Sequence, residues 1–149
     1  MKILFIDHRS PKIGSTRIWV HNLHHWLCQL GIEAALNDTE DLARYDVVIL
    51  GKGVGSLQWV DRIESENPSA LIGWVNTSID PSLVDSETRR RNERIDFLLV
   101  GSVEERDFRL QFKREIFIFP LIERLYTGWK EHTDHHPIVL GYHGNAFHL

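Results

Sequence analysis

The sequence predicts an α/β domain built on a doubly wound, mostly parallel β-sheet. Three observations predict this fold class. Short apolar runs recur along the chain, segments of helical periodicity lie between them, and turns containing glycine or proline separate the two. The apolar runs are continuous rather than alternating, which is typical of strands buried on both faces, as in a parallel sheet.

The first unit of the chain reads as a strand, a glycine loop and a helix. Residues 2–7, KILFID, form the first apolar run, and Gly14 marks the loop behind it. Ser15 and Thr16 offer an N-cap for the helix, and Gly31 is expected to end it as a C′ glycine. The residues at helical spacing that we expect to face the core are Ile18, Trp19, Leu23, Trp26, Leu27 and Leu30.

The alternation of strands and helices continues to residue 119. Further strands are expected at residues 33–36, 46–50, 70–75, 97–100 and 116–119. Helices are expected at residues 57–66, 82–94 and 103–113. Strands that alternate with helical segments favour a sheet that is covered by helices on both faces.

Length and composition narrow the class of protein. The 149 residues suffice for one domain with a core, and the net charge of −4 argues against a nucleic-acid partner. The single cysteine, Cys28, excludes an internal disulfide, fits a reducing compartment and is expected to pack as a small hydrophobe. No stretch approaches the roughly 20 apolar residues of a membrane span. We therefore expect a cytoplasmic protein, with membrane contact made only peripherally, at the inner face.

Polar residues follow several predicted strands, where ligands bind in open α/β sheets. His8 stands at the end of the first strand, as a catalytic general base or a sugar-hydroxyl contact, or in a structural role. Lys52 follows a buried strand and would meet an anionic group, unless it is a solvated lysine on a glycine turn. Asn76 and Thr77 follow the next strand, and Glu104 follows the one after. These four residues are the candidate acceptor-binding set, although Glu104 also suits a purely structural place in a first helical turn.

The loop before the first helix is a candidate phosphate site. Gly14 lets the backbone approach a ligand, Ser15 stands at a helix N-terminus, and Arg17 adds a two-pronged donor for phosphate. A glycine turn with a capped helix is the alternative. The chain lacks the G-x-G-x-x-G fingerprint and the P-loop order of residues, and it has no H-E-x-x-H or C-x-x-C metal motif.

Histidines and arginines gather on two of the predicted helices. The first helix carries three histidines that we expect to face solvent, His21, His24 and His25. The helix at 82–94 carries four arginines, Arg89, Arg90, Arg91 and Arg94. A solvated face is the default interpretation of the arginines, and attraction to anionic lipid head groups is the alternative.

The end of the chain differs from the rest. Residues 129–137 are polar and histidine-rich and are interpreted as a linker rather than a metal site. Residues 138–149 open with the apolar run IVLGY and then a glycine turn. We therefore expect a first domain at 1–128, a linker at 129–137, and the start of a truncated second domain at 138–149.

Several segments together resemble one family, the GT-B glycosyltransferases of the family-4-like group. The matching segments are KILFID, the GSTR of residues 14–17, DVVILGKG, FLLVGSVEERDF, FIFPLIE and IVLGYHGN. The resemblance implies a Rossmann-like N-terminal half that holds a saccharide or lipid-linked acceptor, and a C-terminal half that holds a nucleotide-sugar donor. It implies sugar transfer without a metal or cofactor, and a first glycine loop, here Gly14 and Ser15, that approaches the donor diphosphate.

These interpretations leave three hypotheses. The first is the acceptor-binding half of a glycosyltransferase that makes a cell-surface polysaccharide or glycolipid, inactive by itself because the acidic donor-binding motif of the family has no match here. The second is a non-catalytic, Rossmann-like module that binds a nucleotide or phosphate. The third is an interaction domain that presents exposed tryptophans, such as Trp59 or Trp129, to a partner.

Overall fold

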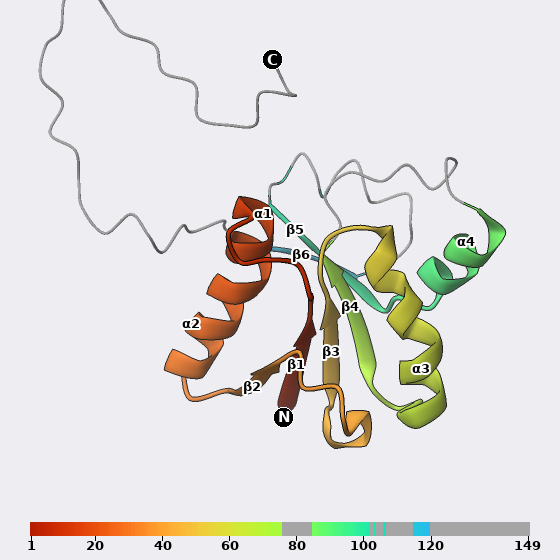
Figure 1. The fold of residues 1–149 in the computed structure, drawn as a ribbon, viewed down its shortest axis with the longest axis horizontal. Helices are drawn as coiled ribbons and strands as arrows, with labels where there is room; N and C mark the ends of the chain where they lie inside the picture. Colours follow the sequence, from red (N-terminus) through yellow and green to blue (C-terminus); the bar gives the residue numbers. More distant parts are fainter. Residues whose placement is uncertain (76–84, 102, 104–105, 107–114, 120–149) are drawn as a thin grey trace, which may run out of the picture.

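The computed structural model describes residues 1–75, 85–101, 103, 106 and 115–119. Its centre is a six-stranded sheet in the order β2-β1-β3-β4-β5-β6, and every neighbouring pair is parallel (Figure 1). The strands are β1 (Lys2–Ile6), β2 (Glu33–Leu36), β3 (Val47–Leu50), β4 (Leu71–Val75), β5 (Phe97–Val100) and β6 (Glu115–Ile118). The predicted parallel α/β sheet is confirmed, and each strand lies within about a residue of its predicted range.

The direction of winding reverses between β1 and β3. The chain runs from β1 to β2 on one side and then crosses back over β1 to reach β3 on the other side. Ile3 therefore pairs with Ala34 of β2 and with Val47 of β3. In open α/β sheets such a reversal separates the two loops that follow the strands and leaves a crevice at their carboxyl ends.

Alternate residues of β1, β3, β4 and β5 enter two different cores. Leu4 and Ile6 of β1 lie in one core with Ile63 of the helix α3 (Trp59–Glu66). Phe5 lies in the other core with Val20 of the first helix. Figure 1 shows α1 and α2 on one side of the sheet and α3 and α4 on the other. The continuous apolar runs of the central strands are thus explained, because both faces of the sheet are covered there. In the edge strand β6, by contrast, Phe117 and Ile118 are exposed.

The first helix has three consecutive parts, and one predicted cap is wrong. The parts are α1 (Gly14–Thr16), the π-helical η1 (Arg17–Asn22) and α2 (Leu23–Gln29). The N-cap is Ile13, which has no side-chain cap, and neither Ser15 nor Thr16 caps the helix because both lie inside it. Gly31 does end the helix: its φ is 76°, and a Schellman pair of hydrogen bonds joins Gly31 N to Cys28 O and Ile32 N to Leu27 O.

The prediction of which residues of this helix face the core and which face solvent is wrong in part. Trp26 is 41% exposed and Leu30 is 76% exposed, whereas both were expected in the core. Cys28 is also exposed, so it is not packed as a core hydrophobe. His21, His24 and His25 are all half-buried rather than solvated. The stripe that reaches the core runs through Val20 and the positions three and seven residues after it, and Trp26 lies one position off that stripe.

The helix α4 (Ser86–Glu93) pairs its arginines with α3. Arg90 and Arg91 bind the two carboxylate oxygens of Asp61 at 2.6 and 2.7 Å, and Arg94 binds Glu64. These arginines are therefore engaged in ion pairs between helices rather than simply solvated. The N-cap Asp85 accepts a hydrogen bond from Thr88 N at 2.8 Å, which begins the helix at Ser86.

Several predicted segments lie outside the described residues. They include most of the predicted helix 103–113, the linker 129–137 and the segment 138–149, so the predicted domain boundaries stay predictions. Two short 3₁₀ helices complete the described part, η2 (Leu42–Arg44) and η3 (Val54–Gln58). None of the helices described is long and apolar enough to cross a membrane.

Candidate functional site

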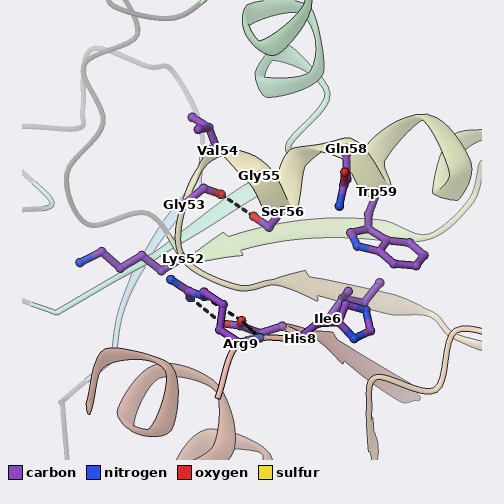
Figure 2. Close-up of a pocket in the computed structure, with 11 residues that line it drawn as sticks. Ile6, His8, Arg9, Lys52, Gly53, Val54, Gly55, Ser56, Gln58 and Trp59 are labelled. Atoms are coloured by element: carbon purple, nitrogen blue, oxygen red, sulfur yellow. Dashed lines mark hydrogen bonds and ion pairs between the residues drawn. The ribbon is translucent and has the colours of Figure 1, made fainter. Parts of the chain in front are cut away.

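A pocket of about 550 Å³ opens at the carboxyl ends of β1 and β3 (Figure 2). One wall is the end of β1 and the loop behind it, and the other is the segment that leads from β3 into α3. The residues that line the pocket are Ile6, Asp7, His8, Arg9, Lys52, Gly53, Val54, Gly55, Ser56, Gln58 and Trp59. The pocket therefore lies at the reversal of strand order, which is where open α/β sheets bind ligands.

An ion pair between the half-exposed Arg9 and the buried Asp7 lines this pocket. The carboxylate of Asp7 is only 3% exposed and accepts two hydrogen bonds from Arg9, from Nε at 2.8 Å and from Nη2 at 2.5 Å. The Arg9 backbone N–H also donates to Asp7 Oδ1 at 3.1 Å. The hydrogen bond from Arg9 to the Asp7 carboxylate raises the pKa of the guanidinium above its ordinary value. Arg9 is thus held as a cation with one face committed to Asp7.

The backbone of Asp7 is held in turn by Asn37, which follows β2. The Asn37 side chain accepts from Asp7 N at 2.8 Å and donates to Asp7 O at 3.0 Å. Asn37 itself has a φ of 57°, in the left-handed region that asparagine tolerates better than most residues. The edge strand β2 therefore fixes the direction in which the loop after β1 leaves the sheet.

The turn after β3 is built from glycines and one serine. Gly51 is buried, and its N–H donates to Ile6 O at 2.9 Å. Gly53 has a φ of 102°, which a residue with a side chain rarely adopts. The Ser56 hydroxyl lies 2.7 Å from the carbonyl oxygens of both Gly51 and Gly53, which closes the turn. Figure 2 shows the contact with Gly53. The Gly51 carbonyl also accepts from the buried Trp74 Nε1 at 3.1 Å.

Two aromatic rings, those of His8 and Trp59, form one end of the pocket. The His8 imidazole lies against the Trp59 indole, with ring centroids 5.6 Å apart and tilted by 34°. The Arg62 guanidinium lies 5.5 Å from the Trp59 ring centroid and binds Glu66. Figure 2 shows His8 and Trp59 together at one end of the pocket, and Lys52 extending away from them at the other end.

This arrangement can bind an anionic ligand that has an apolar or ring-shaped part. Arg9 and Lys52 supply cationic donors, and the turn from Gly53 to Ser56 allows close approach of a ligand to the backbone. The His8–Trp59 pair supplies a flat surface on which a sugar or base can lie. Because Asp7 neutralises part of the charge of Arg9, Lys52 is the lining cation without a hydrogen-bonded carboxylate in the described part of the chain.

The structure brings together only some of the residues that the sequence singled out. His8 and Lys52 both line the pocket. Gly14, Ser15 and Arg17 do not line it, and Arg17 instead lines a second hollow on the flank of the first helix. Their role as donor-phosphate ligands stays a prediction. The remaining three candidates lie outside the described residues: Asn76, Thr77 and Glu104.

Most lining residues were not among the predicted site residues, and Asp7, Ser56 and Trp59 show why. Asp7 directly follows the apolar run of β1. A polar residue at the end of a buried strand is a sequence signal from which this site residue could have been predicted. Ser56 lies in a glycine-rich stretch, where a serine that closes the turn has no distinctive sequence pattern. The sequence indicates Trp59 only as an exposed partner contact, whereas Trp59 is half-buried against His8.

Neither a metal centre nor a known relative identifies the site. In the part of the chain that the structure describes, no three His, Cys, Asp or Glu side chains gather closely enough to hold a metal ion. No protein family, no curated protein and no solved structure matches the chain.

Proposed function

We propose that this chain is the acceptor-binding half of a glycosyltransferase, and that the pocket between β1 and β3 holds an acceptor that carries both a saccharide and a phosphate. The observation that carries the proposal is the meeting of His8, Arg9 and Lys52 in one pocket at the strand reversal. The resemblance of the sequence to GT-B enzymes supports the same assignment. An acceptor linked to a lipid diphosphate has this chemistry.

Residues at different places along the pocket have different roles. Lys52 and the free edge of Arg9 bind the phosphate of the acceptor. The sugar lies on Trp59, where His8 receives the proton of the attacking hydroxyl as a general base. The hydroxyl oxygen forms the new bond to the anomeric carbon of the donor sugar, and the nucleoside diphosphate leaves with the bonding electrons. The donor would be held mainly by a second domain, opposite this pocket.

Binding to the 149-residue chain tests the proposal directly. Isothermal titration with a hexose 1-phosphate, a lipid-linked saccharide diphosphate in detergent, and the unphosphorylated hexose separates the roles of charge and sugar. We expect the phosphorylated ligands to bind, and Lys52→Ala and His8→Gln to weaken binding by about ten-fold each. The matched control is Lys12→Ala, because Lys12 is an exposed lysine near the end of β1 that does not line the pocket.

Free nucleotides and activity assays distinguish the alternatives. Tight binding of a nucleoside diphosphate, unchanged when a sugar is attached, would favour the non-catalytic nucleotide- or phosphate-binding module. Binding that Lys12→Ala weakens as much as Lys52→Ala would contradict the assignment of the pocket. Robust sugar transfer by this chain without a second domain would contradict the part of the proposal that makes it one half of an enzyme.

A further inference from the structure

The first helix and the loop before it form a basic segment in an acidic chain. From His8 to Ile32 the sequence contains no Asp or Glu, although the whole chain has 21 acidic residues against 17 Lys and Arg. The same segment carries Arg9, Lys12, Arg17 and four of the nine histidines. The segment is therefore locally cationic, while the chain as a whole has a net charge of −4.

Two large apolar side chains of this helix, Trp26 and Leu30, are exposed. They lie one helical turn apart, and Leu30 N donates to Trp26 O at 3.0 Å. Side chains at this spacing share one face of a helix. Neither residue belongs to a core cluster, so the two form an apolar pair on the surface of the layer that α1 and α2 make on one side of the sheet (Figure 1).

A second hollow, of about 340 Å³, lies beside this apolar pair. Its lining includes Arg17, His21, His24 and His25, and none of its described lining residues carries a carboxylate. The His25 ring packs edge-on against Trp26, with ring centroids 5.1 Å apart. The basic hollow and the apolar pair are therefore contiguous on the surface of the helix.

This combination matches the chemistry of an anionic lipid surface. Helices that lie in a membrane interface carry Lys and Arg beside exposed Trp and Leu side chains. Tryptophan is favoured at the level of the lipid head groups, because its ring is apolar and its N–H can donate a hydrogen bond. Each Lys or Arg near an anionic leaflet adds to the attraction.

A second copy of the chain fits the same face less well. Two-fold pairing through this helix would set Lys12 and Arg17 of one copy against the basic segment of the other, and like charges repel. Two apolar side chains also fall far short of the roughly 1,200 Å² that a stable protein interface buries. Charge complementarity therefore favours an anionic bilayer over a second copy.

We propose that the first helix is a docking site for the surface of an anionic lipid bilayer. Trp26 and Leu30 enter the interface between head groups and acyl chains, and Lys12 and Arg17 bind lipid phosphates. The contact is peripheral, because the apolar surface is limited to a few side chains of one face of the helix.

Docking in this way brings the pocket between β1 and β3 close to the lipid. His8 and Arg9 line that pocket, and Pro11, in the same loop, lines the hollow on the helix. A lipid-linked ligand could then reach the pocket while its acyl chains stay in the membrane. The docking site itself rests on the first helix and not on the proposed function of the pocket.

Vesicle binding by the full 149-residue chain tests the docking site. One readout is co-sedimentation with vesicles of phosphatidylcholine alone and with vesicles that also contain phosphatidylglycerol. The other is the emission of an environment-sensitive maleimide dye on Cys28, which is exposed on the same helix and is the single cysteine of the chain. The dye therefore reports this helix alone.

We expect the chain to sediment with the anionic vesicles, with at least ten-fold weaker binding to phosphatidylcholine alone and at high salt. The dye emission should shift to the blue when anionic vesicles are added. Trp26→Ala and Leu30→Ala should each weaken binding by about five- to ten-fold. Their matched control is Leu71→Ala, because Leu71 is an exposed leucine at the start of β4, away from this helix.

Charge reversal tests the basic part of the site. Lys12→Glu should weaken binding to anionic vesicles by about ten-fold or more. Arg89→Glu changes the net charge equally, and Arg89 is exposed on α4, on the other side of the sheet (Figure 1), so this variant should bind like the wild type. Circular dichroism verifies that each variant folds.

Three results would overturn the docking site. The first is a wild-type chain that does not sediment with anionic vesicles. The second is binding that Arg89→Glu weakens as much as Lys12→Glu, because net charge rather than this helix would then drive it. The third is self-association without lipid that Trp26→Ala abolishes, which would assign the face to a second copy. Binding of sugar phosphates to the pocket is measured without vesicles, so either proposal can fail while the other stands.

Discussion

Gly51 lies so close to the side chain of Asp7 that only a glycine fits at position 51. A Cβ added to Gly51 would lie under 3.0 Å from Asp7 atoms, a distance that real Cβ atoms essentially never show. Asp7 cannot easily yield, since Arg9 and Asn37 hold its side chain and its backbone. The carboxyl ends of β1 and β3 therefore pack tightly against each other.

Gly51→Ala should accordingly destabilise the protein by about 1–3 kcal/mol, the usual cost of overpacking a buried site. The measurement is thermal or urea unfolding followed by circular dichroism. Gly55→Ala is the matched control in the same turn, because a Cβ there meets nothing within 4 Å. Equal stability of the two variants would show that Asp7 moves aside freely and that the strand ends are not tightly matched.

Asn37 is expected to show two separate effects when it is replaced. Asn37→Gly keeps the left-handed backbone but removes both hydrogen bonds to Asp7, which should cost about 1–2 kcal/mol. Asn37→Ala removes the same bonds and adds backbone strain of about 1 kcal/mol. Urea unfolding should therefore rank the wild type above Asn37→Gly, and Asn37→Gly above Asn37→Ala. If Asn37→Ala were more stable than Asn37→Gly, the left-handed backbone at position 37 would not be a source of strain.

Asp7→Asn should change stability and ligand binding in opposite directions. The neutral amide leaves Arg9 without its carboxylate, so stability falls by about 1–3 kcal/mol. The same change removes one negative charge from the pocket, so phosphorylated ligands should bind about three- to ten-fold more tightly. Asp38→Asn is the control for net charge, because Asp38 pairs with Arg44 and does not line the pocket. Weaker phosphate binding by a folded Asp7→Asn variant would argue that Asp7 itself contacts the ligand.

The pairing of α3 with α4 should depend on pH through Asp61. Hydrogen bonds from Arg91 and Arg90 hold the pKa of Asp61 below its ordinary value. Because the folded state binds the proton less readily than the unfolded chain, the stabilisation is complete above about pH 4 and is lost as the pH falls through the lower, folded pKa. We therefore expect Asp61→Asn to melt below the wild type at pH 7, and the difference to vanish in strong acid.

A neighbouring glutamate supplies the control for this pH dependence. Glu93 is exposed on α4, and Glu93→Gln should melt like the wild type across the same pH range. Added salt should also reduce the effect of Asp61→Asn, because the pair is partly exposed. A difference between Asp61→Asn and the wild type that is the same at pH 2 and pH 7 would rule out the ion pairs as its source.

The local sequence was sufficient to predict the strands because a strand buried on both faces needs an uninterrupted apolar run. KILFI, VVIL and FLLV each satisfy that requirement and each form a strand. The end of the first helix was also predictable, because the Schellman turn at Gly31 needs a left-handed residue within a few positions of the helix. His8 and Lys52 could be placed at the sheet edge by the same local logic.

Only the tertiary structure decided which strand ends are neighbours, and hence what the pocket contains. Strand order is set by packing between residues far apart in the chain, so the position of Asp7 beside Gly51 and of His8 beside Trp59 could not be read from local pattern. The same holds for His24 and Cys28, whose spacing is local but whose shared contact with Ala34 depends on how the helix packs on β2. Periodicity thus determined the elements of this protein, whereas contacts across the sheet determined its sites.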